Sequence, residues 1–142
     1  MIEQSVEDVM TRSVRTITGE LTACDVAVLF ADHDIGSAVV VDPKTDEITG
    51  IVTESDIMQQ VAARADIESV RIDSFLSAPV ITIASSESIH AAAEVMKEHS
   101  IRRLPVVDDG DLVGILTTTN LTYYLPRLRN TILRGRNEFS GQ

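Results

Sequence analysis

The sequence predicts an α/β (α+β) fold in which two pseudo-twofold-related β-α-β-β-α repeats pack through their small sheets. The chain has 142 residues, a length that suits one compact module. Residues 13–42 align without a gap to residues 79–108 at an offset of 66. Nine residues of the first segment are identical in the second: Val14, Thr16, Ile17, Ala27, His33, Ile35, Val40, Val41 and Asp42. Apolar runs stay short, whereas a membrane-spanning helix needs about 20 apolar residues in a row.

Each repeat is predicted to contain the same elements in the same order. A short β-branched strand comes first, near residues 14–17 and again near 80–83. A helix follows, because apolar residues recur at helical spacing in both copies: Val26, Leu29 and Phe30, then Ala92, Val95 and Met96. Two apolar strands form a hairpin, 38–41 with 48–52 and 104–107 with 112–116, and the second hairpin turns at an Asp-Gly step. The hairpin strands are nearly all apolar, so we expect them to be buried on both faces.

A second helix is predicted to open at Thr53 and at Thr117. Thr53 and Asp56 fit a capping box with Asp in place of the usual Glu. These elements place the first repeat at residues 1–66, the second at 67–125 and a basic tail at 126–142. One repeat of this size cannot cover both faces of its sheet, so two copies should stack and create two equivalent clefts, where small ligands commonly bind.

Charge and cysteine content narrow the classes of function. The net charge is −10, which argues against a general DNA-binding protein because phosphate contacts need a basic face. Residues 126–142 carry four arginines against Glu138, a net +3, and leave −13 on residues 1–125. This tail could be an arm for a partner or nucleic acid, although arginines meeting the protein's own acidic surface is the simpler interpretation. The single Cys24 indicates a reducing compartment, and the acidic N-terminus predicts no signal peptide, so we expect a cytoplasmic protein.

Lysine is scarce: only Lys44 and Lys97 accompany ten arginines. Few lysines with many acidic residues is typical of proteins from salt-rich cytosols and suggests a halophilic archaeon. An ordinary acidic bacterial or archaeal protein is the alternative.

Three features, each present twice at matched spacing, resemble a pair of cystathionine-β-synthase (CBS) domains, also called a Bateman module. The first is the opening Met10-Thr11-Arg12-Ser13-Val14-Arg15-Thr16-Ile17. The second is the helix-to-strand passage from His99 to Asp108, and the third is the closing Gly50-Ile51-Val52-Thr53-Glu54-Ser55-Asp56. The resemblance covers residues 5–125. It implies the binding of an adenosine-containing molecule, such as AMP, ADP, ATP, S-adenosylmethionine or NAD, and assembly into a homodimer.

The resemblance also implies roles for individual residues. In the family the Thr of the closing motif reaches the phosphate, its Asp holds the ribose hydroxyls, and an Arg or His before the Leu-Pro step meets phosphate. A carboxylate suits a ribose diol because it accepts both hydroxyls, and a guanidinium pairs with phosphate through two hydrogen bonds. The main cleft is therefore expected to contain Thr53, Asp56, Pro79, Val80, Thr82, Arg102, Arg103 and Pro105.

The second cleft is expected to be weaker. It would contain Val14, Thr16, Gly36, Ser37, Ala38, Thr117 and Asn120. Asn120 stands where the motif expects Asp, and no Arg precedes the equivalent strand. The loss of charge on the hydroxyl contact is worth about 1 kcal/mol.

Structural interpretations of the same residues stay open. Thr53 and Asp56 could simply cap a helix, and Arg102 and Arg103 could be a solvated pair on an acidic protein. The three histidines and Cys24 do not form a four-ligand set, so no metal site is predicted.

The sequence shows neither a nucleophile paired with a base nor a phosphate-binding loop, so it gives no support for an enzyme. We therefore expect a regulatory module that senses an adenosine nucleotide and signals to an unidentified effector protein. The alternative is a structural or partner-binding module with empty clefts that contacts a partner or RNA through its Arg-rich tail.

Overall fold

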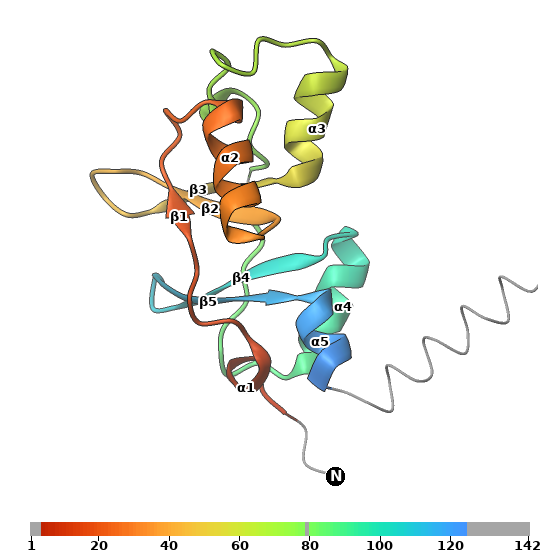
Figure 1. Cartoon of the computed structure of the whole chain (residues 1–142). Coiled ribbons are helices and arrows are strands. Elements are labelled where there is room, and N and C mark those ends of the chain that lie inside the picture. Colours follow the sequence, from red (N-terminus) through yellow and green to blue (C-terminus); the bar gives the residue numbers. More distant parts are fainter. Residues whose placement is uncertain (1–3, 79, 125–142) are drawn as a thin grey trace, which may run out of the picture. The chain divides into compact units, whose positions relative to one another are not determined.

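The computed structural model describes residues 4–78 and 80–124 (Figure 1). Pro79 and the predicted tail at 126–142 therefore lie outside the described residues. The chain divides into two compact units, which are described separately. The central unit is residues 14–81, and the split unit joins residues 1–13 to residues 82–142.

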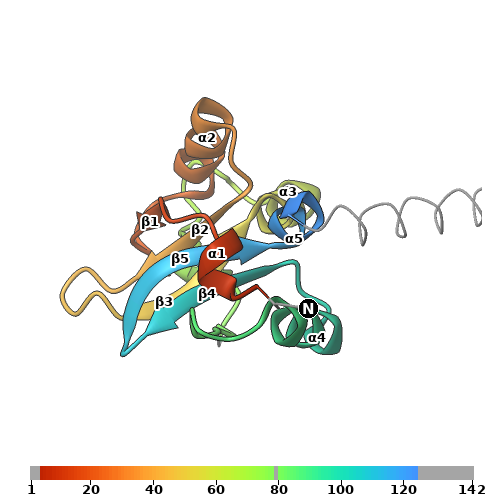
Figure 2. The same ribbon diagram turned by 90° about the horizontal axis from the view of Figure 1, so that it is seen from below.

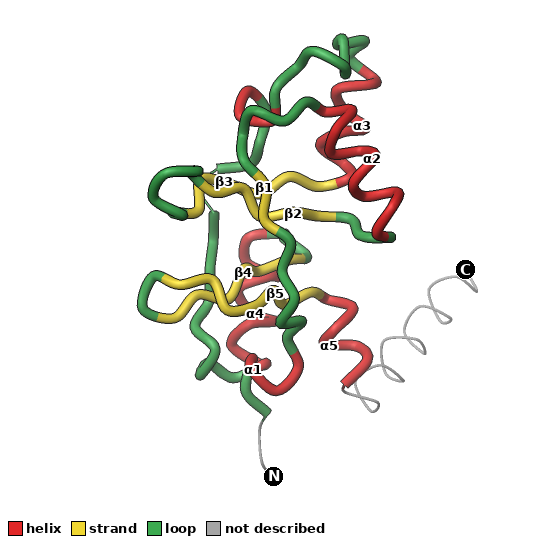
Figure 3. The backbone as a smooth tube through the Cα atoms, turned by 60° about the vertical axis from the view of Figure 1, so that its left-hand side comes forward, coloured by secondary structure: helices red, strands yellow, loops and turns green. Residues whose placement is uncertain are grey.

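The central unit contains one three-stranded sheet and two α-helices. Its elements are β1 (Thr16–Ile17), α2 (Ala23–His33), β2 (Ser37–Val41), β3 (Ile48–Thr53), α3 (Glu54–Ala62) and the 3-10 helix η1 (Ile72–Ser74). Strand order is β1-β2-β3, with β1 parallel to β2 and β2 antiparallel to β3. Helices α2 and α3 pack against each other (Figure 3). Val26, Phe30, Val40, Val52 and Ile72 are among the buried side chains that form the core of this unit.

The split unit repeats much of this plan with a smaller sheet. Its elements are α1 (Val6–Val9), α4 (Ile89–His99), β4 (Arg103–Asp108), β5 (Asp111–Thr117) and α5 (Thr118–Tyr124). Strands β4 and β5 form an antiparallel hairpin. Helix α1 contacts both β5 and α5 (Figure 2). Leu104, Val106 and Leu116 have no exposed surface. The structure thus confirms the mixed α/β fold built from two repeats.

The two repeats exchange their lead-in segments, meaning the residues that precede the body of each repeat. Thr11 and Ile115 exchange two backbone hydrogen bonds of 2.9 Å, which attach the first lead-in to β5 of the split unit. Ser77 and Ile51 exchange the equivalent pair, at 3.0 and 3.1 Å, within the central unit. Each lead-in therefore folds with the body of the other repeat, an arrangement that the internal alignment alone does not reveal.

A glycine makes room for each lead-in. A Cβ atom added to Gly50 would lie 2.8 Å from the carbonyl oxygen of Ser77 and would overlap the side chain of Leu76. A Cβ added to Gly114 would lie 2.9 Å from the carbonyl oxygen of Thr11. Contacts below 3.0 Å force atoms to move, so only glycine admits the lead-in strand at this distance.

The predicted strand at residues 80–83 is wrong. Only an isolated bridge between Ile83 and Val106 forms there, whereas β1 forms in the first repeat. In the central unit the amide of Val39 donates to the carbonyl oxygen of Arg15 at 3.2 Å. Pro105 occupies the position equivalent to Val39 and has no N–H, so this ladder bond cannot form in the split unit.

The expectation of hairpin strands buried on both faces holds only in part. The middle residues of β2 and β4 are buried, but β3 and β5 alternate between buried and partly exposed positions. β2 is the middle strand of its sheet, but β4 and β5 are both edges of a two-stranded sheet, so edge position alone does not account for the difference.

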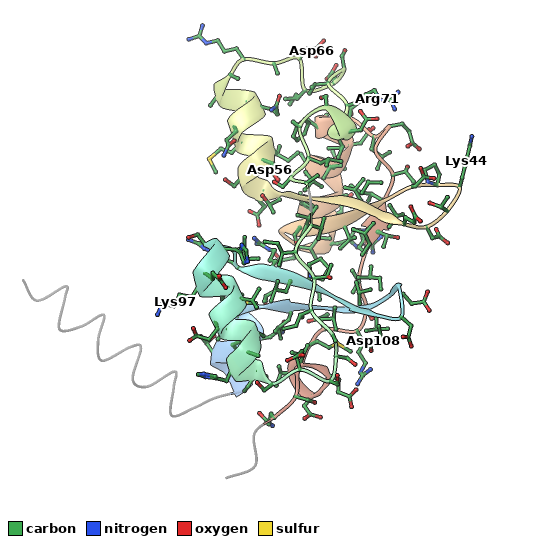
Figure 4. All side chains as sticks on the ribbon, turned by 180° about the vertical axis from the view of Figure 1, so that it is seen from behind. Lys44, Asp56, Asp66, Arg71, Lys97 and Asp108 are labelled. Carbon is green, nitrogen blue, oxygen red and sulfur yellow. The ribbon has the colours of Figure 1, made fainter. Side chains whose placement is uncertain are left out.

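A side-chain contact fastens the end of β4 in the split unit. The carboxylate of Asp108, labelled in Figure 4, accepts the backbone N–H of Ser85 at 2.9 Å and its hydroxyl at 2.5 Å. These two hydrogen bonds hold the pKa of Asp108 below its ordinary value. In the central unit Gly19 stands where Ser85 would be, and Asp42 instead accepts the N–H of Lys44 in its own turn.

Candidate functional site

The predicted Thr-x-x-Asp turn lies where β3 passes into α3. Thr53 is the N-cap of α3, and Asp56 at the start of this helix is labelled in Figure 4. The N–H of Thr53 donates to Oδ2 of Asp56 at 2.9 Å, and the N–H of Asp56 donates to Oγ1 of Thr53 at 3.3 Å. The capping interpretation of these residues is therefore confirmed. Both residues are half-buried, and among the described residues no donor pairs with Oδ1 of Asp56.

The equivalent turn in the split unit uses its polar groups more completely. Oδ1 of Asn120 accepts the N–H of Thr117 at 2.9 Å and the Thr117 hydroxyl at 3.0 Å. Nδ2 of Asn120 donates to the Thr11 hydroxyl at 3.4 Å. The side-chain amide of Asn120 has one acceptor atom, Oδ1, and this atom already accepts two hydrogen bonds. The Asp56 carboxylate accepts through Oδ2, so its Oδ1 can still accept hydrogen bonds.

Main-chain carbonyls complete both turns. The carbonyl oxygen of Gly36 accepts the N–H of Glu54, and that of Arg102 accepts the N–H of Thr118, each at 3.0 Å. Sequence reasoning missed these carbonyls and the contact from Thr11. The opening Met10-Thr11, matched by Leu76-Ser77 in the second repeat, was a usable signal for Thr11, because this residue both pairs with β5 and contacts Asn120.

Two arginines stand at the start of β4 in the split unit: Arg102 precedes the strand and Arg103 is its first residue. Arg102 is exposed, and Arg103 is half-buried opposite Thr117 in the β4–β5 register. The one ion pair found among the described residues joins Arg71 to Asp73, so neither arginine pairs with a described carboxylate. Both guanidinium groups keep their charge available to an anion.

The structure separates the predicted cleft residues by unit. Of the main set, Thr53, Asp56 and half-buried Val80 belong to the central unit, while exposed Thr82, Arg102, Arg103 and buried Pro105 belong to the split unit. Of the second set, Val14, Thr16, Gly36, Ser37 and Ala38 belong to the central unit, and Thr117 and Asn120 to the split unit. Within one unit the sheet register brings Ser37 opposite Thr53. The grouping of Asp56 with Arg103 remains a prediction.

No group of three or more His, Cys, Asp or Glu side chains is placed to hold a metal ion within residues 4–78 and 80–124. No helix in this part of the chain is both long and apolar enough to cross a membrane.

These features define a class of protein: a tandem-repeat module in which each repeat closes with a capped Thr turn. The family model of the CBS domain matches residues 6–63 and 72–127. The chain therefore belongs to the CBS domain family.

Two curated relatives resemble the chain over most of its length. An uncharacterized protein of Methanopyrus kandleri is 36% identical over 137 residues, which cover 95% of this chain and 69% of the relative. The CBS domain-containing protein YhcV of Bacillus subtilis is 31% identical over 117 residues, 82% of each chain. In contrast, a homoserine O-acetyltransferase of Methanocorpusculum labreanum is 35% identical, but the match spans only 23% of that enzyme.

Solved structures share the fold. The CBS domain pair of protein MJ0100, in complex with 5′-methylthioadenosine and S-adenosyl-L-methionine, superimposes with a TM-score of 0.80 at 25% identity. The match covers 88% of this chain and 98% of that one. A hexameric CBS-CP12 protein from bloom-forming cyanobacteria matches with a TM-score of 0.79 at 27% identity, over 87% of this chain and 69% of that one.

Proposed function

We propose that this chain is a regulatory module that binds an adenosine-containing ligand and reports the binding to a partner protein. The observation that carries the proposal is the Thr53–Asp56 turn, in which Asp56 caps the helix with one carboxylate oxygen and retains the other. A carboxylate oxygen of this kind accepts hydrogen bonds from the hydroxyls of a ribose. The ligands of the MJ0100 domain pair, which are adenosine compounds, support the choice of ligand class.

The predicted phosphate contact belongs to Arg103, with Arg102 beside it. Both are free of ion pairs with described residues in a chain whose net charge is −10. A guanidinium without a carboxylate partner is available for a bidentate bond to phosphate. AMP, ADP, ATP, S-adenosylmethionine and NAD all present the same adenosine group, and arginine contacts would favour those with phosphate.

The proposal gives the two turns unequal roles. Asp56 is charged and has acceptor capacity to spare, whereas the only acceptor of Asn120 is already engaged by Thr117. We therefore expect the Asp56 turn to carry the tighter binding. Reporting to a partner would be a population shift, because a ligand that prefers one arrangement of the module increases its share. In this proposal the module is a cytoplasmic homodimer, acts on a separate effector and performs no chemistry of its own.

The experiment is thermal unfolding with a panel of ligands: AMP, ADP, ATP, S-adenosylmethionine, 5′-methylthioadenosine and NAD. A ligand at 100 times its Kd adds about 2.7 kcal/mol of stability. For a chain of this length the rise in Tm is several degrees. The unfolding is measured both at low salt, which suits an ordinary acidic protein, and in molar KCl, which suits a protein from a salt-rich cytosol.

The decisive variant is Asp56→Asn, with Asp25→Asn as its matched control. Asp25 makes the same capping box with Thr22 at the start of α2, through bonds of 3.0 and 3.1 Å, but belongs to neither predicted cleft. Both variants lose one charge and keep a capping oxygen. Asp56→Asn should weaken ligand binding about fivefold, or about 1 kcal/mol, while Asp25→Asn leaves it unchanged. If no ligand of the panel raises Tm, the sensing role is rejected in favour of a partner-binding module. If both variants weaken binding equally, the assignment of the binding to the Asp56 turn is rejected.

A further inference from the structure

A pocket of about 500 Å³ lies between β1 and α2 of the central unit, and all of its lining residues belong to this unit. Its strand side is Arg15 and the two residues of β1, and its helix side includes Leu21, Asp25, Val28 and Leu29. Only Thr16 is shared with the predicted second cleft. We call this pocket the β1–α2 groove.

The strand side of the groove is an open edge of the sheet. β1 is the outermost strand in the order β1-β2-β3, and Thr16 is in register with Val39. Val39 donates its N–H to the carbonyl oxygen of Arg15 at 3.2 Å, so β1 bonds to β2 through the neighbours of Thr16. The N–H and C=O of Thr16 therefore point away from β2. Main-chain groups at such an edge are those to which an added strand binds.

The floor of the groove is apolar. Ile17 is 8% exposed, and Leu21 and Leu29 are half-buried and packed against the core of the central unit. Val28 on the helix side is 53% exposed. In the described part of the split unit the equivalent segment forms only an isolated bridge at Ile83, so this strand edge is a feature of the central unit.

A positive and a negative charge mark opposite ends of the groove. The guanidinium of Arg15 lies 3.3 Å from Nδ1 of His33, the last residue of α2. Asp25 is in the first turn of the same helix, and the rise from Asp25 to His33 is about 12 Å. Neither Arg15 nor Asp25 takes part in an ion pair with a described residue. Both charges are therefore available to an occupant of the groove.

We propose that the β1–α2 groove binds an extended segment of a partner protein, which adds a strand to the open edge of β1. An extended chain advances about 3.3 Å per residue, so about four residues cover the distance between the charges, and alternate side chains share one face. The segment that fits has an acidic, an apolar and a basic residue at alternate positions. Its acidic group meets Arg15, its apolar group covers the floor, and its basic group meets Asp25.

The biological role of this surface rests on the proposed function, because the groove would receive the partner to which ligand binding is reported. Peptide binding is measured without any nucleotide. A failure of the groove proposal is therefore distinguishable from a failure of ligand sensing.

The test is an NMR titration of the isotope-labelled full-length protein with two pentapeptides, acetyl-Glu-Thr-Leu-Thr-Lys-amide and the same sequence in reverse order. The two directions allow parallel and antiparallel addition to β1. One of them should shift the amide resonances of Thr16, Ile17 and Leu29. No shift at these residues with either peptide at millimolar concentration would overturn the proposal.

Backbone methylation distinguishes strand addition from the binding of any apolar compound. Alternate amides of a strand face its neighbour, so only one of two successive peptide amides can donate to β1. Peptides methylated at the amide of the central Leu, or at that of the Thr after it, should differ in affinity at least about fivefold. Equal affinities would show that the groove is a small-molecule pocket and would overturn the proposal.

The acidic position is tested through Arg15. A peptide with Gln in place of Glu should bind the wild type about threefold more weakly than the Glu peptide, and this preference should disappear in Arg15→Gln. Arg64→Gln is the matched control, because Arg64 is an exposed arginine of the same unit outside the groove. The net charge of −10 disfavours an acidic peptide in general, so a preference for Glu identifies a local contact. A preference that persists in Arg15→Gln, or disappears equally in Arg64→Gln, would overturn the proposed recognition.

Discussion

The closing motif has glycine at position 50, and we expect that the close approach of Leu76 and Ser77 to β3 is the reason. The substitution Gly50→Ala tests this explanation. The added methyl group would lie 2.8 Å from the carbonyl oxygen of Ser77 and overlap Leu76. If the lead-in stays in place, overpacking costs about 1–3 kcal/mol. If it detaches instead, the two backbone hydrogen bonds between Ser77 and Ile51 are lost, at about 1 kcal/mol each. Both routes lead to a loss of about 2 kcal/mol.

Urea unfolding measures this loss, and hydrogen exchange at the Ser77 amide shows which route is taken. Exchange at Ser77 should accelerate if the lead-in detaches and stay slow if the strain is absorbed in place. In a double-mutant cycle, Leu76→Ala should recover part of the loss because it removes one of the two clashing groups. A Gly50→Ala protein within 0.5 kcal/mol of the wild type, with unchanged exchange at Ser77, would refute the steric explanation.

Three further changes test other local features. Gly110→Ala should cost about 1 kcal/mol in urea unfolding, because Gly110 has a φ of +83° although nothing lies within 4 Å of an added Cβ; Gly110→Asn should cost less, and a larger loss for Asn would contradict this reasoning. Asp108→Asn should destabilise the protein at neutral pH. Because the folded-state pKa of Asp108 is lowered, its contribution is present above the unfolded pKa of about 3.9 and disappears as pH falls through the folded value, so urea midpoints of variant and wild type should converge in acid. Thr22→Ala removes the α2 cap and should cost about 1 kcal/mol without changing ligand affinity, as measured by calorimetry.

Local patterns carried most of the prediction. The capping boxes depend on side chains three residues apart, so Thr53 and Asp56 could be placed from the sequence alone. The hairpins followed from apolar runs around turn residues. The failure at residues 80–83 has a non-local cause, because Pro105 lies far along the chain and its missing N–H removes a bond that the strand would need from its neighbour.

The exchanged lead-ins could not be predicted from local patterns, because the periodicity of apolar residues does not indicate with which repeat a segment will pack. Gly50 and Gly114 were the available signal: glycine at the same place in two apolar strands indicates a close backbone approach, and only the structure shows what approaches. The candidate site is limited by the same non-local information. Its cap geometry was predictable, but the engagement of Asn120 by Thr11 depends on the exchange.

That exchange has a consequence for how such a chain could have arisen. A protein with a single repeat would lack the lead-in that fills the strand position beside its glycine here, and its own lead-in would lack the body with which it folds here. Two identical copies that swap arms satisfy both needs at once, so the ancestor implied by this topology is a domain-swapped pair rather than a monomer. Gene duplication and fusion would then have turned the swap into a covalent connection. Once joined, the two halves could change independently. Asp56 and Asn120, which differ at equivalent positions of the two repeats, are an example.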